Sequence, residues 1–161
     1  MWIWGHRVDA AERVSPGRVI MVDSSFRAVE LARANAVTNG LSEVTALLSD
    51  GWEAVPELLQ GQVSVVLANP PYHTDYRVPR CLLAGARRFL RTGGNCYFVV
   101  KRAGWYRQRF QSVFRNASVR EVGGYSVVRG LKSDGVSGEK VPTGKLARRQ
   151  AAAAERKRRR R

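Results

Sequence analysis

The sequence contains few of the residue types that build metal centres or disulfide frameworks. Among 161 residues there are 2 cysteines and 2 histidines, and their spacing fits no zinc or iron site. Cys81 and Cys96 both lie inside apolar segments. We interpret both as reduced core residues of an intracellular protein and predict no metal ion.

The chain also lacks long apolar runs and has little acidic charge. No run approaches the roughly 20 residues of a membrane span, and the Trp-rich start lacks the apolar stretch of a signal peptide. We therefore predict a cytoplasmic protein without a membrane partner. Only 13 acidic residues oppose 28 basic ones, which gives a net charge of +15. This excess favours a polyanionic partner such as RNA or DNA, with a merely solvated basic surface as the alternative.

The most informative stretch is residues 65–72, a short apolar run followed by Asn-Pro-Pro-Tyr. The run predicts a buried parallel strand, and ligands of open α/β sheets bind where such strands end. The side-chain oxygen of Asn69 and the carbonyl of Pro70 are two acceptors that could hold both hydrogens of a planar amine. Pro70 and Pro71 stiffen the loop, and Tyr72 could stack on the amine's ring. An ordinary turn after a strand is the alternative.

Strand and helix patterns alternate around this motif. Strands are expected at residues 18–22, 44–49, 65–68 and 96–100, and helices at 26–39, 52–59, 77–91 and 105–115. Residues 118–122 and 125–129 flank a Gly-Gly turn and predict a hairpin. An amphipathic piece at 8–14 resembles the last turns of a helix. The order predicts an α/β fold, a doubly wound and mostly parallel sheet with a C-terminal antiparallel hairpin.

Acidic residues follow the first two predicted strands. Asp23 is placed to accept hydrogen bonds from ribose hydroxyls, although Asp23, Ser24 or Ser25 could equally cap the next helix. Asp50 could accept from an adenine amino group with Trp52 packed nearby, and an ordinary Asp-Gly turn is the alternative.

Together the motif and the order of elements resemble the class I, Rossmann-like methyltransferases, and more closely the methyltransferase small domain family. The resemblance is carried by residues 19–35, 39–41, 49–50, 69–73, 90–94 and 124–125. It implies an enzyme that uses S-adenosyl-L-methionine to methylate an exocyclic amine of RNA. In the ribosomal RNA guanine-N2 enzymes the motif usually reads Asn-Pro-Pro-Phe-His. His73 favours that branch, while Tyr72 also admits adenine-N6 or protein glutamine-N5 chemistry.

The resemblance also implies a role for each motif residue. Asp23 and Ser24 would hold the cofactor ribose, and Asp50 and Gly51 its adenine. The target amine would be bound and polarised by Asn69 with the two prolines, and its ring would stack on the tyrosine of the motif. Catalysis would then rest on alignment and polarisation, without a strong base.

One departure from the family is expected to affect the fold. The family begins with a strand and a Gly-x-Gly-x-Gly turn, and no such turn precedes Asp23. We therefore expect an N-terminally shortened domain whose sheet lacks its central strand, with unpaired backbone groups on both flanks. An inactive remnant that binds RNA through its tail is the alternative to an enzyme.

The composition changes after residue 132. We assign residues 1–132 to the domain and 133–161 to a disordered basic tail. The last 30 residues carry 11 basic and 3 acidic side chains. Arg156, Lys157 and Arg158 are the predicted phosphate contacts, and a solvating extension without a partner is the alternative. The sequence makes no prediction of the oligomeric state.

Overall fold

The computed structural model describes residues 18–71, 76–114 and 116–133. The helical piece predicted at residues 8–14 and the tail from residue 134 onward lie outside the described residues. The elements run β1 Val19–Asp23, α2 Phe26–Thr38, β2 Val44–Leu48, η1 Glu57–Leu59, β3 Val63–Ala68, α3 Arg77–Phe89, β4 Leu90–Val100, α4 Gly104–Val113, β5 Ser118–Val122 and β6 Tyr125–Leu131. Apart from the segment between β2 and β3, the described residues follow the predicted alternation of strands and helices.

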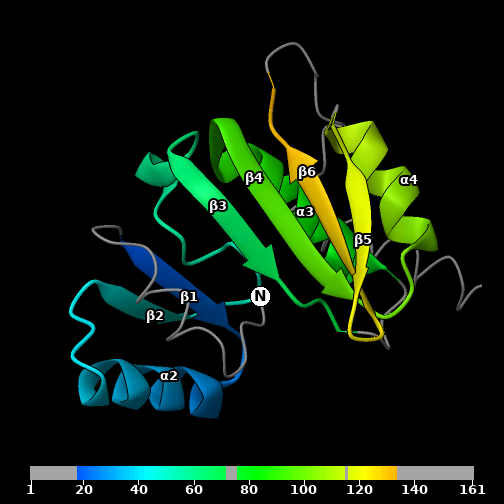
Figure 1. The fold of residues 1–161 in the computed structure, drawn as a ribbon. Coiled ribbons are helices and arrows are strands. Elements are labelled where there is room, and N and C mark those ends of the chain that lie inside the picture. The colour runs from blue at the N-terminus through cyan, green and yellow to red at the C-terminus, as the bar shows by residue number, and fades with distance from the viewer. Residues whose placement is uncertain (1–17, 72–75, 115, 134–161) are drawn as a thin grey trace, which may run out of the picture.

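The strands form two sheets rather than one (Figure 1). β1 and β2 pair in parallel, with Val19 opposite Val44 and Asp23 opposite Leu48. The second sheet has the order β3-β4-β6-β5, in which β3 and β4 are parallel and β6 is antiparallel to both its neighbours. The mostly parallel arrangement with a C-terminal hairpin agrees with the prediction.

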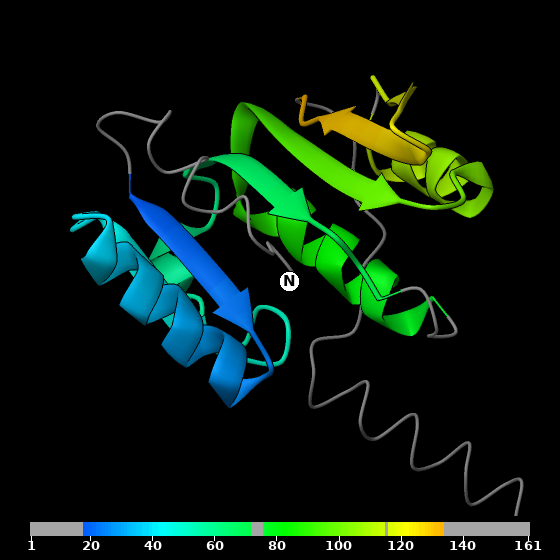
Figure 2. The same cartoon turned by 60° about the horizontal axis from the view of Figure 1, so that its bottom comes forward.

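The break between the sheets lies where the sequence predicted a missing central strand. Within the described residues β1 pairs only with β2, and β3 pairs only with β4. Figures 1 and 2 show β1 and β3 as the facing edges of the two sheets. No backbone ladder therefore joins the two sheets in this part of the chain, and side-chain packing must hold them together.

Alternating side chains of β1 reach both faces of the small sheet. Met21 packs with Val29 of α2 on one face. Val22 packs with Phe89 of α3 on the opposite face, together with Val55. Residues one apart on a strand point to opposite faces, so α2 and α3 lie on opposite sides of the sheet. This is the doubly wound arrangement, and the contact of Val22 with Phe89 is where the two sheets join.

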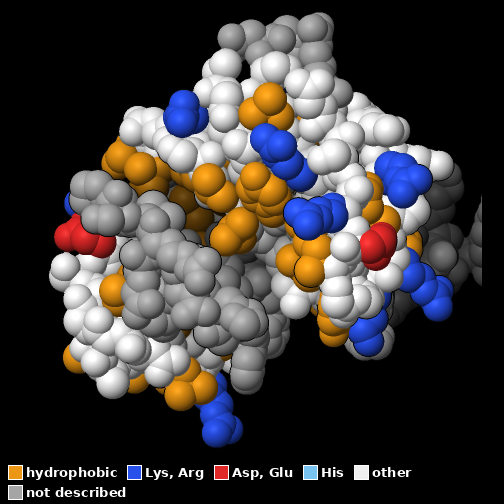
Figure 3. Space-filling view, in the orientation of Figure 1, with side chains coloured by type: hydrophobic (Ala, Val, Ile, Leu, Met, Phe, Trp, Pro, Cys, Tyr) orange, Lys and Arg blue, Asp and Glu red, His pale blue; other side chains and the backbone are white. Residues whose placement is uncertain are grey.

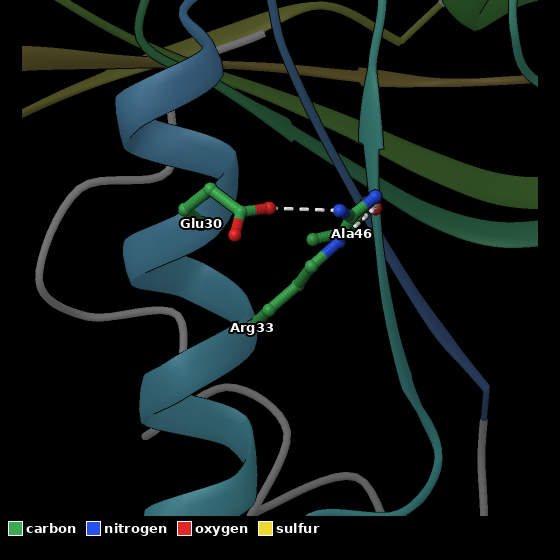
Figure 4. Close-up of polar contacts among 3 residues, drawn as sticks. All are labelled: Glu30, Arg33 and Ala46. Atoms are coloured by element: carbon green, nitrogen blue, oxygen red, sulfur yellow. Dashed lines mark hydrogen bonds and ion pairs between the residues drawn. The ribbon is translucent and has the colours of Figure 1, made fainter.

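α2 is also tied to the outer edge of the small sheet by a polar contact (Figure 4). The Nε and Nη2 atoms of Arg33 donate to the carbonyl of Ala46 in β2 at 3.3 and 3.0 Å. Its Nη1 atom pairs with Glu30 at 2.8 Å. A guanidinium that donates to a carbonyl of an edge strand competes with the backbone hydrogen bonds by which another chain could pair with that strand.

α3 and α4 cover the same face of the four-stranded sheet. Leu83 and Ala86 of α3 and Phe110 of α4 share one buried cluster with Phe98 of β4 and Val128 of β6. All five side chains are no more than 1% exposed. The apolar residues of α4 and the residue after it, Tyr106, Phe110, Val113 and Phe114, recur at helical spacing and all belong to this core.

Three local predictions are wrong. Residues 52–59 form turns and a short 3-10 helix, because Pro56 interrupts the segment. α3 ends at Phe89 rather than at the predicted residue 91, and the long strand β4 begins at Leu90, six residues before the predicted strand. Cys81 is exposed, whereas Cys96 is buried as expected.

Candidate functional site

Three parallel strands carry the predicted site residues at their carboxyl ends. β1 ends at Asp23, β2 is followed by Ser49 and Asp50, and β3 is followed by Asn69. The register of β1 with β2 brings the first two strand ends together, because the N–H of Ser49 donates to the carbonyl of Asp23 at 2.9 Å. The ends of β1 and β2 are therefore one structural unit.

Asp23 is fixed by the turn that follows β1. The residue is 1% exposed, and its Oδ1 atom accepts a hydrogen bond from the N–H of Ser25 at 2.8 Å. The N-cap of α2 is Ser25, whose hydroxyl accepts from the N–H of Ala28 at 3.4 Å. Asp23 is thus not the capping residue, and its carboxylate orients the backbone between β1 and α2.

An open pocket of about 450 Å³ lies beside this turn. It is lined by residues from the ends of β1 and β2 and from the turn after β2, namely Ser24, Leu48, Ser49, Asp50, Glu53 and Ala54. Ser24 and Asp50 were predicted from the sequence, and the structure brings them to the same pocket. Their hydroxyl and carboxylate groups are acceptors suited to ribose hydroxyls or a purine amino group.

Glu53 lines the pocket but was not predicted as a site residue from the sequence. It lies three residues after Asp50, where the sequence predicted a helix, and the turn that forms instead places it in the pocket lining. That turn is held by the buried hydroxyl of Ser49, which accepts from the N–H of Ala54 at 2.9 Å. Gly51 begins the turn with a φ of +68°, a conformation that favours glycine.

Trp52, predicted to pack near the adenine site, is not among the residues that line the pocket. Its Nε1 atom donates to the carbonyl of Leu82 at 3.2 Å, and its ring stacks on Phe89 at a centroid distance of 4.9 Å. Gly85 leaves the groove on α3 that the indole fills. A large apolar ring gains more from this burial than from an open polar pocket, so Trp52 anchors the pocket turn to α3.

The Asn-Pro-Pro segment continues directly from β3. Asn69 and Pro71 are half-buried, and Pro70 is among the most completely buried residues. Burial of the proline ring fixes the backbone on which Asn69 sits. Asn69 is not among the residues that line the pocket at the ends of β1 and β2.

The remaining predicted site residues lie outside the described part of the chain. These are Tyr72, His73, Arg156, Lys157 and Arg158. Among the described residues, no group of three or more His, Cys, Asp or Glu side chains is arranged to hold a metal ion. No helix in the same residues has the length and apolarity to cross a membrane.

The comparison with protein families agrees with the strand order and the motif. The sequence pattern of the methyltransferase small domain matches residues 8–129, which is most of the chain. The chain belongs to the methyltransferase small domain family. The resemblance seen in the sequence motifs is therefore confirmed.

Two curated relatives are ribosomal RNA methyltransferases. Ribosomal RNA large subunit methyltransferase G of Streptomyces coelicolor is 33% identical over 106 residues, which cover 63% of this chain and 27% of the relative. Ribosomal RNA small subunit methyltransferase C of Pseudomonas entomophila is 29% identical over 125 residues, which cover 74% of this chain and 36% of the relative. The chain thus spans about a quarter to a third of the length of these relatives.

A solved structure shares the fold. It is a 16S rRNA N2 methyltransferase of T. thermophilus, described in complex with AdoMet and guanosine. The TM-score is 0.64 at 24% identity, with 72% of this chain and 32% of that chain covered. The likeness confirms the Rossmann-like fold class that the sequence predicted.

Proposed function

We propose that this small-domain protein binds S-adenosyl-L-methionine and methylates an exocyclic amine of RNA, with guanine N2 of ribosomal RNA as the target. The observation that carries the proposal is the placement of Asp23, Asp50 and Asn69 at the carboxyl ends of three parallel strands. Ligands of open α/β sheets bind at these ends. The names of the two curated relatives point to the same substrate class.

The pocket at the ends of β1 and β2 fits the adenosine half of this cofactor. Ser24 and Asp50 offer acceptors on the pocket wall, and Asp23 holds the turn that presents Ser24. A Cβ atom added to Gly51 would meet no other atom within 4 Å, so a purine has room to approach this turn. When bound, the cofactor supplies an electrophilic methyl group.

Asn69 is the residue we assign to the target amine. The lone pair of an exocyclic amine is delocalised into its ring, which makes the nitrogen a poor nucleophile. Acceptors fixed at both amine hydrogens favour a tetrahedral nitrogen and localise the lone pair. The buried ring of Pro70 holds the Asn69 backbone, so the amide oxygen needs little reorganisation to act.

RNA as the substrate is supported by the charge of the chain. The net charge is +15, and no acidic residue occurs from Tyr76 to Arg120. This stretch includes α3 and α4, which follow the strands nearest the predicted amine site. Several Lys and Arg side chains lie over the larger sheet in the space-filling view (Figure 3). A polyanion is therefore attracted to the part of the molecule that carries Asn69. A cytoplasmic location, where ribosomal RNA is found, fits the proposal.

Single-turnover methylation of ribosomal RNA tests the assignment. Asn69→Ala should lower the rate about 100-fold to 1,000-fold, the usual effect of losing one preorganised contact to the transition state. Cofactor affinity, measured by calorimetry on the same protein, should change little. Asn116→Ala is the matched control, because this exposed asparagine lies in the turn before β5.

The methyl acceptor is identified in the same assay. Ribosomal RNA, DNA and a glutamine-containing protein fraction are offered in parallel with a radiolabelled methyl donor. Label on guanine of RNA supports the proposal. Label confined to adenine or to protein glutamine would replace the substrate, and an Asn69→Ala protein that methylates at the parent rate would remove Asn69 from the chemistry.

A further inference from the structure

A pair of stacked aromatic rings lies on segments that follow β3 and β4, the end of the larger sheet that also carries Asn69. Tyr76, just before α3, stacks on Trp105 in the first turn of α4 with ring centroids 4.4 Å apart and an interplanar angle of 19°. Tyr76 follows β3 and Trp105 follows β4, and these two strands are parallel neighbours. The ring pair therefore joins the two chain segments at the carboxyl end of the larger sheet.

The lower ring is anchored in the core. Trp105 meets Tyr106 edge to face at 4.9 Å, and Tyr106 is only 5% exposed. Tyr106 in turn meets Phe98 of β4 edge to face at 6.2 Å. These contacts between rings fix the position of Trp105, so the ring of Tyr76 stacks on a side chain that is held by the core.

Tyr76 is the outermost ring and is accessible. It is 41% exposed, although one of its faces is in contact with Trp105. Tyr76 also meets Tyr106 edge to face at 6.2 Å, so its exposed surface lies away from these two rings. An exposed face of a stacked ring is a favourable place for a nucleobase, because every base has a π face to offer.

The backbone at Tyr76 also supports a dedicated role. Tyr76 has a φ of +57° and is the only residue other than glycine with a positive φ in the described ranges. For an ordinary side chain this conformation costs roughly 1 kcal/mol or more. It places Tyr76 as the residue before α3, although no side-chain hydrogen bond caps that helix.

Basic side chains lie on the segments that carry the two rings. The guanidinium of Arg80 lies 5.8 Å from the centroid of the Trp105 ring. Arg77, Arg80, Lys101, Arg102 and Arg107 are all exposed on the segments that carry the two rings. Phosphate groups that flank a stacked base would meet these cations.

We propose that Tyr76, supported by Trp105, is a stacking platform for the RNA base next to the methylated nucleotide. The proposal rests on the proposed function for the choice of RNA. A target base presented to Asn69 must leave its own stack, and its neighbour loses a stacking partner at the same time. Tyr76 replaces that partner and holds the backbone in register with the amine site.

Packing alone would explain the pair if Tyr76 only closed the gap between α3 and α4. The two roles make different demands on the side chain. Packing needs an apolar body over Trp105, which leucine also supplies. Stacking on a base needs a flat aromatic ring, which phenylalanine supplies and leucine does not.

The test uses the full chain and a short single-stranded oligoribonucleotide that contains 2-aminopurine, whose fluorescence is quenched by stacking. Tyr76→Leu should weaken binding about 5-fold to 150-fold, the usual range for a lost stacking partner, and should abolish the quenching. Tyr76→Phe should retain both. The matched control is Tyr125→Leu, because Tyr125 is also 41% exposed. Its side chain lies on the face of the sheet opposite α3 and α4.

The salt dependence separates the platform from the basic side chains. Loss of a neutral ring should lower affinity by the same factor at every salt concentration and leave the log-log slope unchanged. Circular dichroism and thermal melting monitor the fold of each variant. Equal affinities and equal quenching for Tyr76→Leu and Tyr125→Leu would overturn the proposal. The same loss of RNA affinity in Tyr76→Phe as in Tyr76→Leu would also overturn it.

Binding of the oligoribonucleotide requires neither cofactor nor methyl transfer, so the platform can fail while the proposed function holds. In that case Tyr76→Leu would methylate limiting RNA at the parent rate. If the proposed function fails instead, no label reaches RNA, yet the Tyr76 variants still differ in binding. An acidic peptide is also offered as a competitor of the RNA. If the same peptide concentration displaces the RNA from the parent protein and from Tyr76→Leu, the rings do not recognise a base.

Discussion

Replacement of Gly85 by alanine tests the contact that joins the pocket turn to α3. A Cβ atom on Gly85 would lie 2.1 Å from both Cδ1 and Nε1 of Trp52. Non-bonded carbon atoms do not approach within 3.0 Å, so the indole must move or α3 must shift. Either change affects the segment that carries Asp50, two residues before Trp52.

The magnitude follows from what Trp52 loses. A displaced indole gives up its hydrogen bond to Leu82, worth about 0.5 to 1.5 kcal/mol, and its stack on Phe89, worth about as much. Overpacking adds about 1 to 3 kcal/mol. The better helix propensity of alanine returns about 1 kcal/mol. We expect a net loss of about 1 to 5 kcal/mol, or a fall in Tm of roughly 2 to 20 °C for a chain of this size.

Urea unfolding and thermal melting measure the loss, and calorimetry with S-adenosyl-L-methionine measures the effect on the pocket. Cofactor affinity should fall together with stability. Gly104→Ala is the matched control, because Gly104 begins α4 and a Cβ there would meet no atom within 4 Å. A Gly85→Ala protein as stable as the parent would mean that Trp52 does not occupy the groove on α3.

Four further outcomes are expected. In native protein a thiol reagent should modify Cys81 rapidly and Cys96 only on unfolding, because Cys81 is exposed and Cys96 is buried; modification of both at one rate would contradict the burial. Burial raises the pKa of the Cys96 thiol above its unfolded value of about 8.5. The free energy of unfolding should therefore fall as pH rises above that unfolded value, because the unfolded thiol loses its proton first. Cys96→Ala should lessen this fall, measured by urea titrations at a series of pH values. Asp50→Asn should weaken cofactor binding in calorimetry while Glu43→Gln, at the other end of β2, should not. Equal affinities of the two variants would exclude Asp50 from cofactor binding. Deletion of residues 134–161 should flatten the salt dependence of RNA binding by about 0.7 in log-log slope for each lost phosphate contact, and an unchanged slope would exclude the tail.

Much of the fold could be predicted because strand ends and turns have local signals. Asp23 closes a run of apolar residues, and the two glycines at 123 and 124, both with positive φ, form the hairpin turn. The end of α3 was predicted less well, since residues 90–94 contain glycines that usually terminate a helix. There the pairing of Leu90 with Val63 of β3 extends the strand through those glycines, and such pairing between distant segments has no local signal.

The candidate site was predictable only in part, for a related reason. Asp50 and Ser24 reach one pocket because they follow neighbouring strands, and strand order can be predicted from a family resemblance. Trp52 was predicted to pack near Asp50 because it follows that residue by two positions. The groove that Trp52 fills exists because Gly85 has no side chain. This role of Gly85 has no local signal, because it depends on the packing of α3 against the turn.

The break between the two sheets gives the Trp52 contact its importance. Where a continuous sheet would carry backbone hydrogen bonds from β1 to β3, the described residues offer packing of Val22 and Val55 against Phe89. Trp52 covers the same phenylalanine from the pocket turn. A perturbation at Phe89 must therefore change the position of the cofactor pocket relative to Asn69, because the pocket belongs to the small sheet and Asn69 to the large one. Methyl transfer depends on alignment between these two parts, so Phe89→Leu should lower the methylation rate more than it lowers the affinity for either cofactor or RNA. Equal losses in rate and cofactor affinity would show that the packing serves the pocket alone.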